Sequence, residues 1–213
     1  MSLVDNLIGH LDTVVRTCAG TPAAPDRPNP AGHLAGHLAA ADQDAEARTL
    51  AARLMRINHA GEVSAQALYH GQALTARSPE IRDAMHESAR EEADHLAWCA
   101  ERIDELGGSV SVLNPVWYAG SFGIGAFAGL FGDPVSLGFI AETERQVIHH
   151  LDSHLDRLPE DDTRSRRILE QMRTDEAHHA ESAEELGGVP LPAPAQRVMG
   201  LVSKVMTRTA YWV

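Results

Sequence analysis

Apolar residues recur with helical spacing along most of the 213-residue chain, and no segment shows a sustained alternation of apolar and polar residues. Four breaks divide this pattern, because a proline disfavours helix in the residue before it and a pair of glycines ends a helix. The breaks lie at Ser78-Pro79, Gly107-Gly108, Leu158-Pro159 and Gly187-Gly188. The pattern therefore predicts an all-α fold with long helices over residues 48–76, 79–106, 134–158 and 161–186.

Three other segments lie outside these long helices. Residues 2–17 have leucines and valines at helical spacing and predict an N-terminal helix. Residues 20–36 are rich in proline, glycine and alanine, which indicates a linker or irregular arm rather than a packed element. Residues 194–213 predict an amphipathic C-terminal helix. We therefore divide the chain into an N-terminal helix and arm (1–47) and a helical domain (48–213).

The segment between the two helix pairs, residues 106–132, contains no charged side chain. It is long enough to cross a bilayer if it is helical. Pro115 and several glycines interrupt it, and Asp133-Pro134 follows, so we expect short broken helices rather than one long helix. Two interpretations remain open: a buried crossover between the helix pairs, or a hairpin that dips into a membrane.

Charge and cysteine content restrict the possible partners and compartment. The chain has 18 Lys and Arg against 30 Asp and Glu, a net charge of −12, which argues against nucleic acid as the main partner. Its two cysteines, Cys18 and Cys99, cannot form a disulfide framework, so a reducing cytosolic environment is expected. The N-terminus lacks the basic and apolar runs of a secretory signal, and none is expected.

A repeated motif carries the candidate chemistry. The second and fourth long helices contain Glu92-x-x-His95 and Glu176-x-x-His179, and both helices end in the sequence ELGG. Residues three apart lie on one face of a helix, so each glutamate and histidine can bind the same metal or adjacent metals. Four-helix di-iron and di-manganese proteins use two such motifs together with one glutamate from each remaining helix.

Helix geometry selects the other two glutamates. Glu62 and Glu92 each lie 15 residues from a turn near residue 77, and Glu144 and Glu176 each lie 16 residues from a turn near residue 160. At ~1.5 Å per residue, the members of each pair stand at the same height if their helices are antiparallel. Four glutamates and two histidines therefore meet in one layer if the two helix pairs pack together.

These carboxylates interrupt apolar, core-facing stripes, where four of them would repel one another strongly. Two divalent cations remove that repulsion, and mixed carboxylate and imidazole ligands suit iron or manganese. The alternative is a pair of buried salt-bridge layers, for which Arg173 is the one arginine within a turn of the glutamates on these faces. We favour the metal site.

Several neighbours of these residues are candidates for supporting roles. Glu91 and Asp175 are either acceptors for the outer N–H of a ligand imidazole or solvated acids, and His150 is a further candidate for such a supporting contact. His59 and His149 are expected to be interior or surface histidines, and Cys99 to be a small buried hydrophobe.

The motifs also resemble a known family. NHAGE at 58–62, EADHL at 92–96, AETERQVIHH ending at His150 and DEAHH at 175–179 are similar to the 3-demethoxyubiquinol 3-hydroxylases, the di-iron hydroxylases of ubiquinone biosynthesis. The resemblance covers roughly 48–213 and includes NPVW at 114–117. It implies a ferritin-like four-helix bundle, with the crossover expected as a hydrophobic hairpin, and iron ligands at Glu62, Glu92, His95, Glu144, Glu176 and His179. Glu92 and Glu176 would contact both irons.

The implied reaction is O₂-dependent hydroxylation of the ring of a prenylated quinol, demethoxyubiquinol, with the second oxygen atom leaving as water. The implied cofactors are two iron ions (Fe²⁺/Fe³⁺), with O₂ as co-substrate. An external reductant is needed, because the sequence has no Cys₄ cluster motif and no GxGxxG; the quinol with NADH behind it is the source the resemblance implies. A homo-oligomer, or association with other proteins of ubiquinone biosynthesis, stays open.

A substrate with an isoprenoid tail resides in a membrane, and two segments predict contact with one. The crossover has five aromatic residues, and the C-terminal helix combines Trp212 with three basic residues and no acid. We expect the crossover to cap one end of the bundle, and its glycines to allow close helix approach. We also expect peripheral attachment to the cytoplasmic face of the cell membrane, with the tail passing between these segments. The crossover aromatics are Trp117, Tyr118, Phe122, Phe127 and Phe131. The alternative is that the two segments bury each other or form a dimer interface.

Three other functions share some of these features. A ferritin-like ferroxidase or iron-storage subunit would use the same ligands but leaves the uncharged segment unexplained. A radical-generating subunit of the ribonucleotide reductase type needs a tyrosine near the metals, and Tyr69 is the candidate on that face. A non-enzymatic helical bundle would bind no iron.

Overall fold

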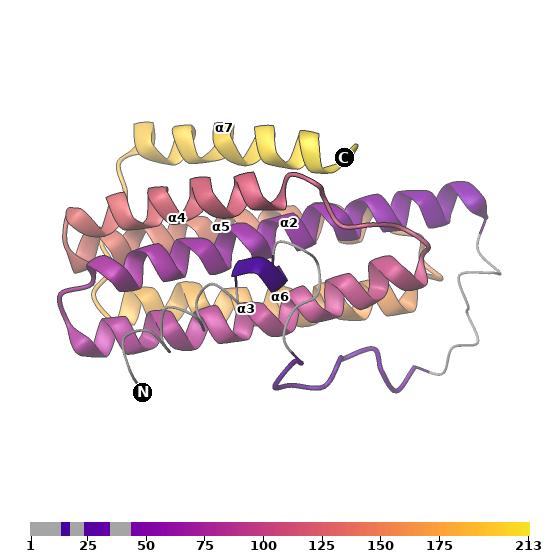
Figure 1. Ribbon diagram of the computed structural model, residues 1–213, viewed down its shortest axis with the longest axis horizontal. Coiled ribbons are helices and arrows are strands. Elements are labelled where there is room, and N and C mark those ends of the chain that lie inside the picture. The colour runs from indigo at the N-terminus through magenta and orange to yellow at the C-terminus, as the bar shows by residue number, and fades with distance from the viewer. Residues whose placement is uncertain (1–13, 18–23, 35–43) are drawn as a thin grey trace.

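The computed structural model describes residues 14–17, 24–34 and 44–213 (Figure 1). Within these residues the chain forms long helices and no strand, so the predicted all-α class is confirmed. Of the expected N-terminal helix, residues 14–17 are helical and the rest lies outside the described residues. The long helices are α2 (Ala45–Thr75), α3 (Pro79–Glu105), α4 (Asn114–Leu130), α5 (Asp133–Arg157), α6 (Thr163–Glu185) and α7 (Ala193–Ala210).

Two helix hairpins form the four-helix core. Helix α2 packs on α3, α5 packs on α6, and short connections join the members of each pair (Figure 1). Side chains from all four helices fill the largest core cluster, with Trp98, Leu54, Leu151 and Leu169 fully or almost fully buried. Burial of such large side chains contributes about 1.5–3 kcal/mol each and fixes the pairs against one another. This arrangement is the ferritin-like bundle predicted from the sequence.

The helix boundaries follow the sequence signals closely. Pro79 occupies the first turn of α3, where a missing N–H costs nothing, and Gly107 and Gly187 follow the ends of α3 and α6 with positive φ angles of 71° and 100°. A left-handed residue at this position ends a helix, and glycine adopts it without steric cost.

The crossover differs from its prediction in two respects. It contains one continuous helix, α4, rather than a hairpin of short broken helices, because Pro115 lies in its first turn and interrupts nothing. It also runs alongside α2 instead of capping one end of the bundle (Figure 1). No helix in the described part of the chain is both long enough and apolar enough to span a membrane.

Glycines explain why α4 lies against α2. A Cβ atom on Gly125 would stand 2.4 Å from the carbonyl oxygen of Leu68, and one on Gly71 would stand 2.2 Å from the carbonyl oxygen of Phe122. Both distances are shorter than any real contact, so the two backbones approach at a separation that only glycine permits. Gly125 of the crossover therefore serves the close helix approach expected from the sequence, rather than interrupting the helix.

Residues 24–34 form the expected irregular arm without helix or strand, but the prediction that this arm is not packed is wrong. Ala31 is completely buried in the main core cluster, and Asn29 donates a hydrogen bond to Glu101 at 2.7 Å. Arg164 of α6 donates to the backbone carbonyl of Leu34 at 2.9 Å. Irregular backbone is stable here because side chains of α3 and α6 satisfy its polar groups.

Candidate metal centre

The predicted layer forms at the centre of the bundle. Glu62 comes from α2, Glu92 and His95 from α3, Glu144 from α5, and Glu176 and His179 from α6; none of these residues is more than 5% exposed. The apolar stripe on each helix determines this placement, because burying the stripe also carries the polar residues within it into the core.

The six side chains form two overlapping groups of potential metal ligands. One group contains Glu62, Glu92, His95 and Glu176, and the other contains Glu92, Glu144, Glu176 and His179. Within each group the ligand atoms lie within 4.8 Å of one another. Glu92 and Glu176 belong to both groups, as expected of carboxylates that bridge two cations.

Both imidazoles point their Nδ1 atoms at the carboxylates. His95 Nδ1 lies 3.2 Å from oxygens of Glu92 and Glu176, and His179 Nδ1 lies 3.1 Å from Glu176. The outer Nε2 atoms face two other acids, Asp175 at 3.0 Å from His95 and Glu91 at 2.9 Å from His179. An Nε2–H that donates outward leaves the lone pair on Nδ1 for a metal.

The buried carboxylates of the layer favour added positive charge. Burial, aided by the negative charge of Glu92, raises the pKa of Glu62 well above its usual value. Burial, followed by the charges of Glu176 and Glu92, likewise raises the pKa of Glu144. Burial alone would lower the pKa of His95, but hydrogen bonds to the surrounding carboxylates raise it strongly. The shifts share one cause, the crowding of buried carboxylates, which positive charge from protons or from cations relieves.

Unpaired oxygens provide a direct test of whether cations fit. Each of the four glutamates has one buried carboxylate oxygen that makes no hydrogen bond of good geometry, although three of these oxygens lie 3.2–3.5 Å from an imidazole Nδ1. Such an atom costs about 1–3 kcal/mol unless something binds it. Oxygens of this kind, clustered with two Nδ1 atoms, fit a pair of divalent cations. They are Glu62 Oε2, Glu92 Oε1, Glu144 Oε2 and Glu176 Oε1.

The alternative of a salt-bridge layer with Arg173 finds no support. Arg173 is exposed and pairs with Asp152 on the bundle surface, at 2.9 Å. The arginine near the layer is Arg27 of the N-terminal arm, which reaches Asp175 and the outer side of His95. Sequence reasoning missed Arg27, since nothing in the periodicity of the arm indicates its distant partners.

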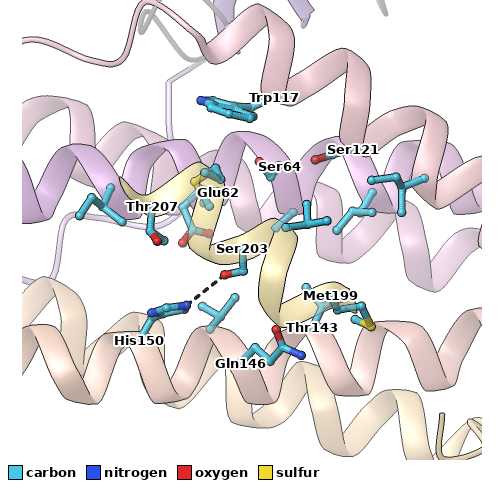
Figure 2. Close-up of a pocket in the computed structure, with 18 of the residues that line it drawn as sticks. Glu62, Ser64, Trp117, Ser121, Thr143, Gln146, His150, Met199, Ser203 and Thr207 are labelled. Carbon is cyan, nitrogen blue, oxygen red and sulfur yellow. Dashed lines mark hydrogen bonds between the residues drawn. The ribbon is translucent and has the colours of Figure 1, made fainter. Parts of the chain in front are cut away.

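The other singled-out residues have distinct surroundings. His150 does not face a ligand imidazole but lies 3.0 Å from Ser203 of α7 (Figure 2). His59 is fully buried, and burial lowers its pKa to about 4; His149 is exposed; Cys99 is buried beside Met172. These last three placements agree with expectation.

Tyr69 lies directly beside the layer. Its hydroxyl donates a hydrogen bond of 2.7 Å to Glu144 Oε1, and it is almost completely buried. Burial and the charge of Glu144 raise the pKa of Tyr69 well above its usual value, so it stays protonated and holds that carboxylate.

An apolar cavity of about 290 Å³ leads to the layer from one side. Helices α2, α4, α5 and α7 supply its walls, and Glu62 is the one ligand candidate that lines it (Figure 2). Trp117 contributes from α4 and Met199 from α7, with a few hydroxyl and amide groups between them. The cavity therefore joins an apolar surface region to one edge of the carboxylate layer.

The outer faces of α4 and α7 are apolar next to this cavity. Phe127 and Phe131 are each 62% exposed and Trp212 is 68% exposed, as a membrane contact requires. Two other aromatics of the expected contact differ: Tyr118 is buried, and Phe122 packs against the core cluster around Val63. Trp117 is partly buried in the cavity wall. On α7 the exposed apolar residues are Val198, Leu201, Val202 and Val205.

Comparison with known proteins gives a consistent result. Residues 49–210 match the family described as ubiquinone biosynthesis protein COQ7. The chain is 57% identical over 208 residues to a 3-demethoxyubiquinol 3-hydroxylase of Cupriavidus metallidurans, covering 98% of this chain and 99% of that one. Proteins of the same name from Nitrosococcus oceani (54% over 214 residues; 100% and 98% covered) and Chromohalobacter salexigens (56% over 211 residues; 99% and 97% covered) are similarly close.

Proposed function

Because the chain belongs to the COQ7 family of ubiquinone biosynthesis proteins, we propose that it hydroxylates the ring of demethoxyubiquinol with O₂ at a pair of iron ions. The observation that carries this proposal is the position of the ligand layer at the inner end of an apolar cavity. Glu92 and Glu176 serve both ligand groups, and Glu62 lies on the cavity wall. A substrate ring in the cavity therefore reaches one edge of the metal pair.

The residues of the chain have four tasks in this scheme. The six ligands hold the metals, with Glu91 and Asp175 fixing the imidazole rings through their Nε2–H groups. The cavity walls bind the ring and the start of the tail and exclude water. Tyr69 keeps Glu144 in place through its hydroxyl. Two irons bound there would supply the activation of O₂ that ring hydroxylation needs.

The hydroxylation consumes one O₂ molecule, two protons and two electrons. One oxygen atom of O₂ replaces a ring hydrogen as a hydroxyl group, and the other leaves as water with two protons and two electrons. An external reductant supplies these electrons, and NADH acting through the quinol is the source we propose.

The cavity distinguishes this function from iron oxidation or storage. A ferrous ion needs a polar path to its site, whereas the walls here are mainly apolar and suit an isoprenoid quinol. A ferroxidase shares the ligands but leaves both the cavity and the apolar faces of α4 and α7 without a role.

Product analysis tests the proposal. Iron-loaded protein, given reduced short-tailed demethoxyubiquinol, ¹⁸O₂ and NADH, is expected to form a hydroxylated quinol that carries one ¹⁸O atom, as measured by mass spectrometry. The Glu176→Ala variant is the control and should form none. Iron oxidation in the wild-type protein without any hydroxylated product would instead favour a ferroxidase.

We also propose that the protein attaches peripherally to the cytoplasmic face of the cell membrane. Exposed apolar residues on α4 and α7 flank the cavity, and exposed Arg197, Lys204 and Arg208 on α7 suit anionic lipid headgroups. A tail that leaves the cavity between these helices stays in lipid, which avoids exposing apolar surface to water.

Flotation with anionic vesicles tests this attachment. Phe127→Asp combined with Phe131→Asp is expected to reduce the vesicle-bound fraction several-fold, because charged groups do not enter the lipid boundary. Thr163→Asp combined with Thr174→Asp adds the same charge to the exposed face of α6 and should change nothing. Equal binding by both double variants would rule out attachment through α4. Dissociation of a wild-type dimer by the phenylalanine variant would indicate a dimer interface instead.

A further inference from the structure

The N-terminal arm, residues 24–34, is hydrogen bonded to α3 at Asp94, next to the proposed ligand His95. Asp94 is 2% exposed, and its Oδ1 accepts hydrogen bonds from the backbone N–H of Asp26 at 2.7 Å and of Arg27 at 3.4 Å. Its Oδ2 accepts from Arg27 Nε at 2.7 Å. Asp94 therefore holds both the backbone of the arm and the base of the guanidinium.

The other end of Arg27 reaches α6. Its Nη1 donates to Asp175 Oδ2 at 2.9 Å, and that same oxygen lies 3.0 Å from His95 Nε2. Gln171 donates to the second oxygen of Asp175 at 2.9 Å. The guanidinium also lies 5.1 Å from the ring centroid of Trp98, which restricts its position. Arg27 thus bridges the two helices that carry the Glu-x-x-His motifs.

The second ligand imidazole has a different environment. His179 Nε2 faces Glu91, whose side chain is 35% exposed and has His179 as its hydrogen-bond partner within the described residues. Asp175, the hydrogen-bond partner of His95, is therefore held in place by Arg27 and Gln171. Glu91, the partner of His179, is instead partly exposed to water.

We infer that Arg27 is a positioning residue that fixes His95 through Asp175 and makes the two halves of the metal site unequal. The inference rests on the proposed di-iron function. The planar guanidinium fork bonds Asp94 and Asp175 together, which a single ammonium group cannot reproduce.

Anaerobic titration with ⁵⁷Fe²⁺, followed by Mössbauer spectroscopy, tests this inference. In Arg27→Gln, one of the two irons is expected to bind about 10-fold or more weakly, in line with other residues that orient metal ligands. The second iron keeps its affinity, and only one of the two quadrupole doublets changes. Arg27→Lys is expected to behave like Arg27→Gln, because it keeps the charge but loses the fork.

Two further variants sharpen the test. Asp94→Asn weakens the hydrogen bonds that hold Arg27 in place. The double variant with Arg27→Gln should therefore bind iron no more weakly than either single variant. Arg173→Gln removes an exposed charge from the helix that carries Asp175 and should leave both affinities unchanged. The melting temperatures of the metal-free variants separate lost positioning from lost folding.

The outcomes also separate this inference from the proposed function. Wild-type protein that binds no iron would overturn the proposed function and this inference with it. Two irons in the wild type with unchanged affinities in Arg27→Gln would overturn the inference alone. Full rescue by Arg27→Lys, or an equal weakening of both irons, would also overturn it.

Discussion

Glu176→Ala protein is expected to lose both iron ions, even though the substitution removes a single carboxylate. Glu176 belongs to both ligand groups, so its loss leaves each cation with fewer donors and leaves the pair without one of its bridges. The variant should still fold, because removing a buried carboxylate relieves the repulsion within a layer that lacks cations. Iron stoichiometry after gel filtration measures the effect.

Substitutions of three other glutamates serve as controls for this prediction. Glu62 and Glu144 each belong to one group, so replacing either with alanine should weaken one ion more than the other. Glu181→Ala, on an exposed position of the same helix as Glu176, should leave two irons per chain. Two tightly bound irons in the Glu176→Ala protein would end the assignment of Glu176 as a bridging ligand.

Removal of iron is expected to lower the melting temperature substantially. A ligand that binds only the folded state stabilises it by about 2.7 kcal/mol when its free concentration is 100 times the dissociation constant. Two such ions give roughly 5 kcal/mol, or about 10–20 °C for a chain of this length. Calorimetry of iron-loaded and metal-free protein measures the difference.

The Glu176→Ala protein is again the control, since it should melt at one temperature with or without iron. The wild type tests the buried charge as well, because burial and neighbouring carboxylates raise the pKa of Glu62 and Glu144, and bound cations would take the place of the protons that this favours. Equal melting temperatures for iron-loaded and metal-free wild-type protein would contradict a site built from these carboxylates.

The layer of candidate ligands was predictable because helix geometry, together with the packing of two antiparallel hairpins, is enough to bring these residues level. Because each residue adds a fixed rise along the helix axis, the number of residues from a turn gives the height of a side chain in the bundle. The turns near 77 and 160 are the two points from which these residues are counted. Glu62 and Glu92, and likewise Glu144 and Glu176, lie at matched distances from these turns, so antiparallel pairing brings them level. The order and type of the helices followed from periodicity in the same way.

The arm and the crossover depended on tertiary contacts that no periodicity encodes. Arg27 meets Asp94 and Asp175 across 67 and 148 residues of sequence, and its own segment has no helical pattern. For α4, the glycines were interpreted both as interruptions and as points of close helix approach; Gly125 serves the second role, since it brings the backbone of α4 against α2. The composition of the arm and of the crossover is unusual, but the groups that their residues contact become known only from the folded structure.

Two of the four helices that line the cavity, α4 and α7, differ in how extensively they pack against the rest of the bundle. Helix α4 lies backbone against backbone with α2, whereas α7 has Ala210 as its one fully buried residue and contacts α2 and α5 more sparsely. The free energy of local opening follows the amount of packed surface that must be separated. Swinging α7 outward therefore costs less than moving α4, and the cavity has one rigid wall and one compliant wall.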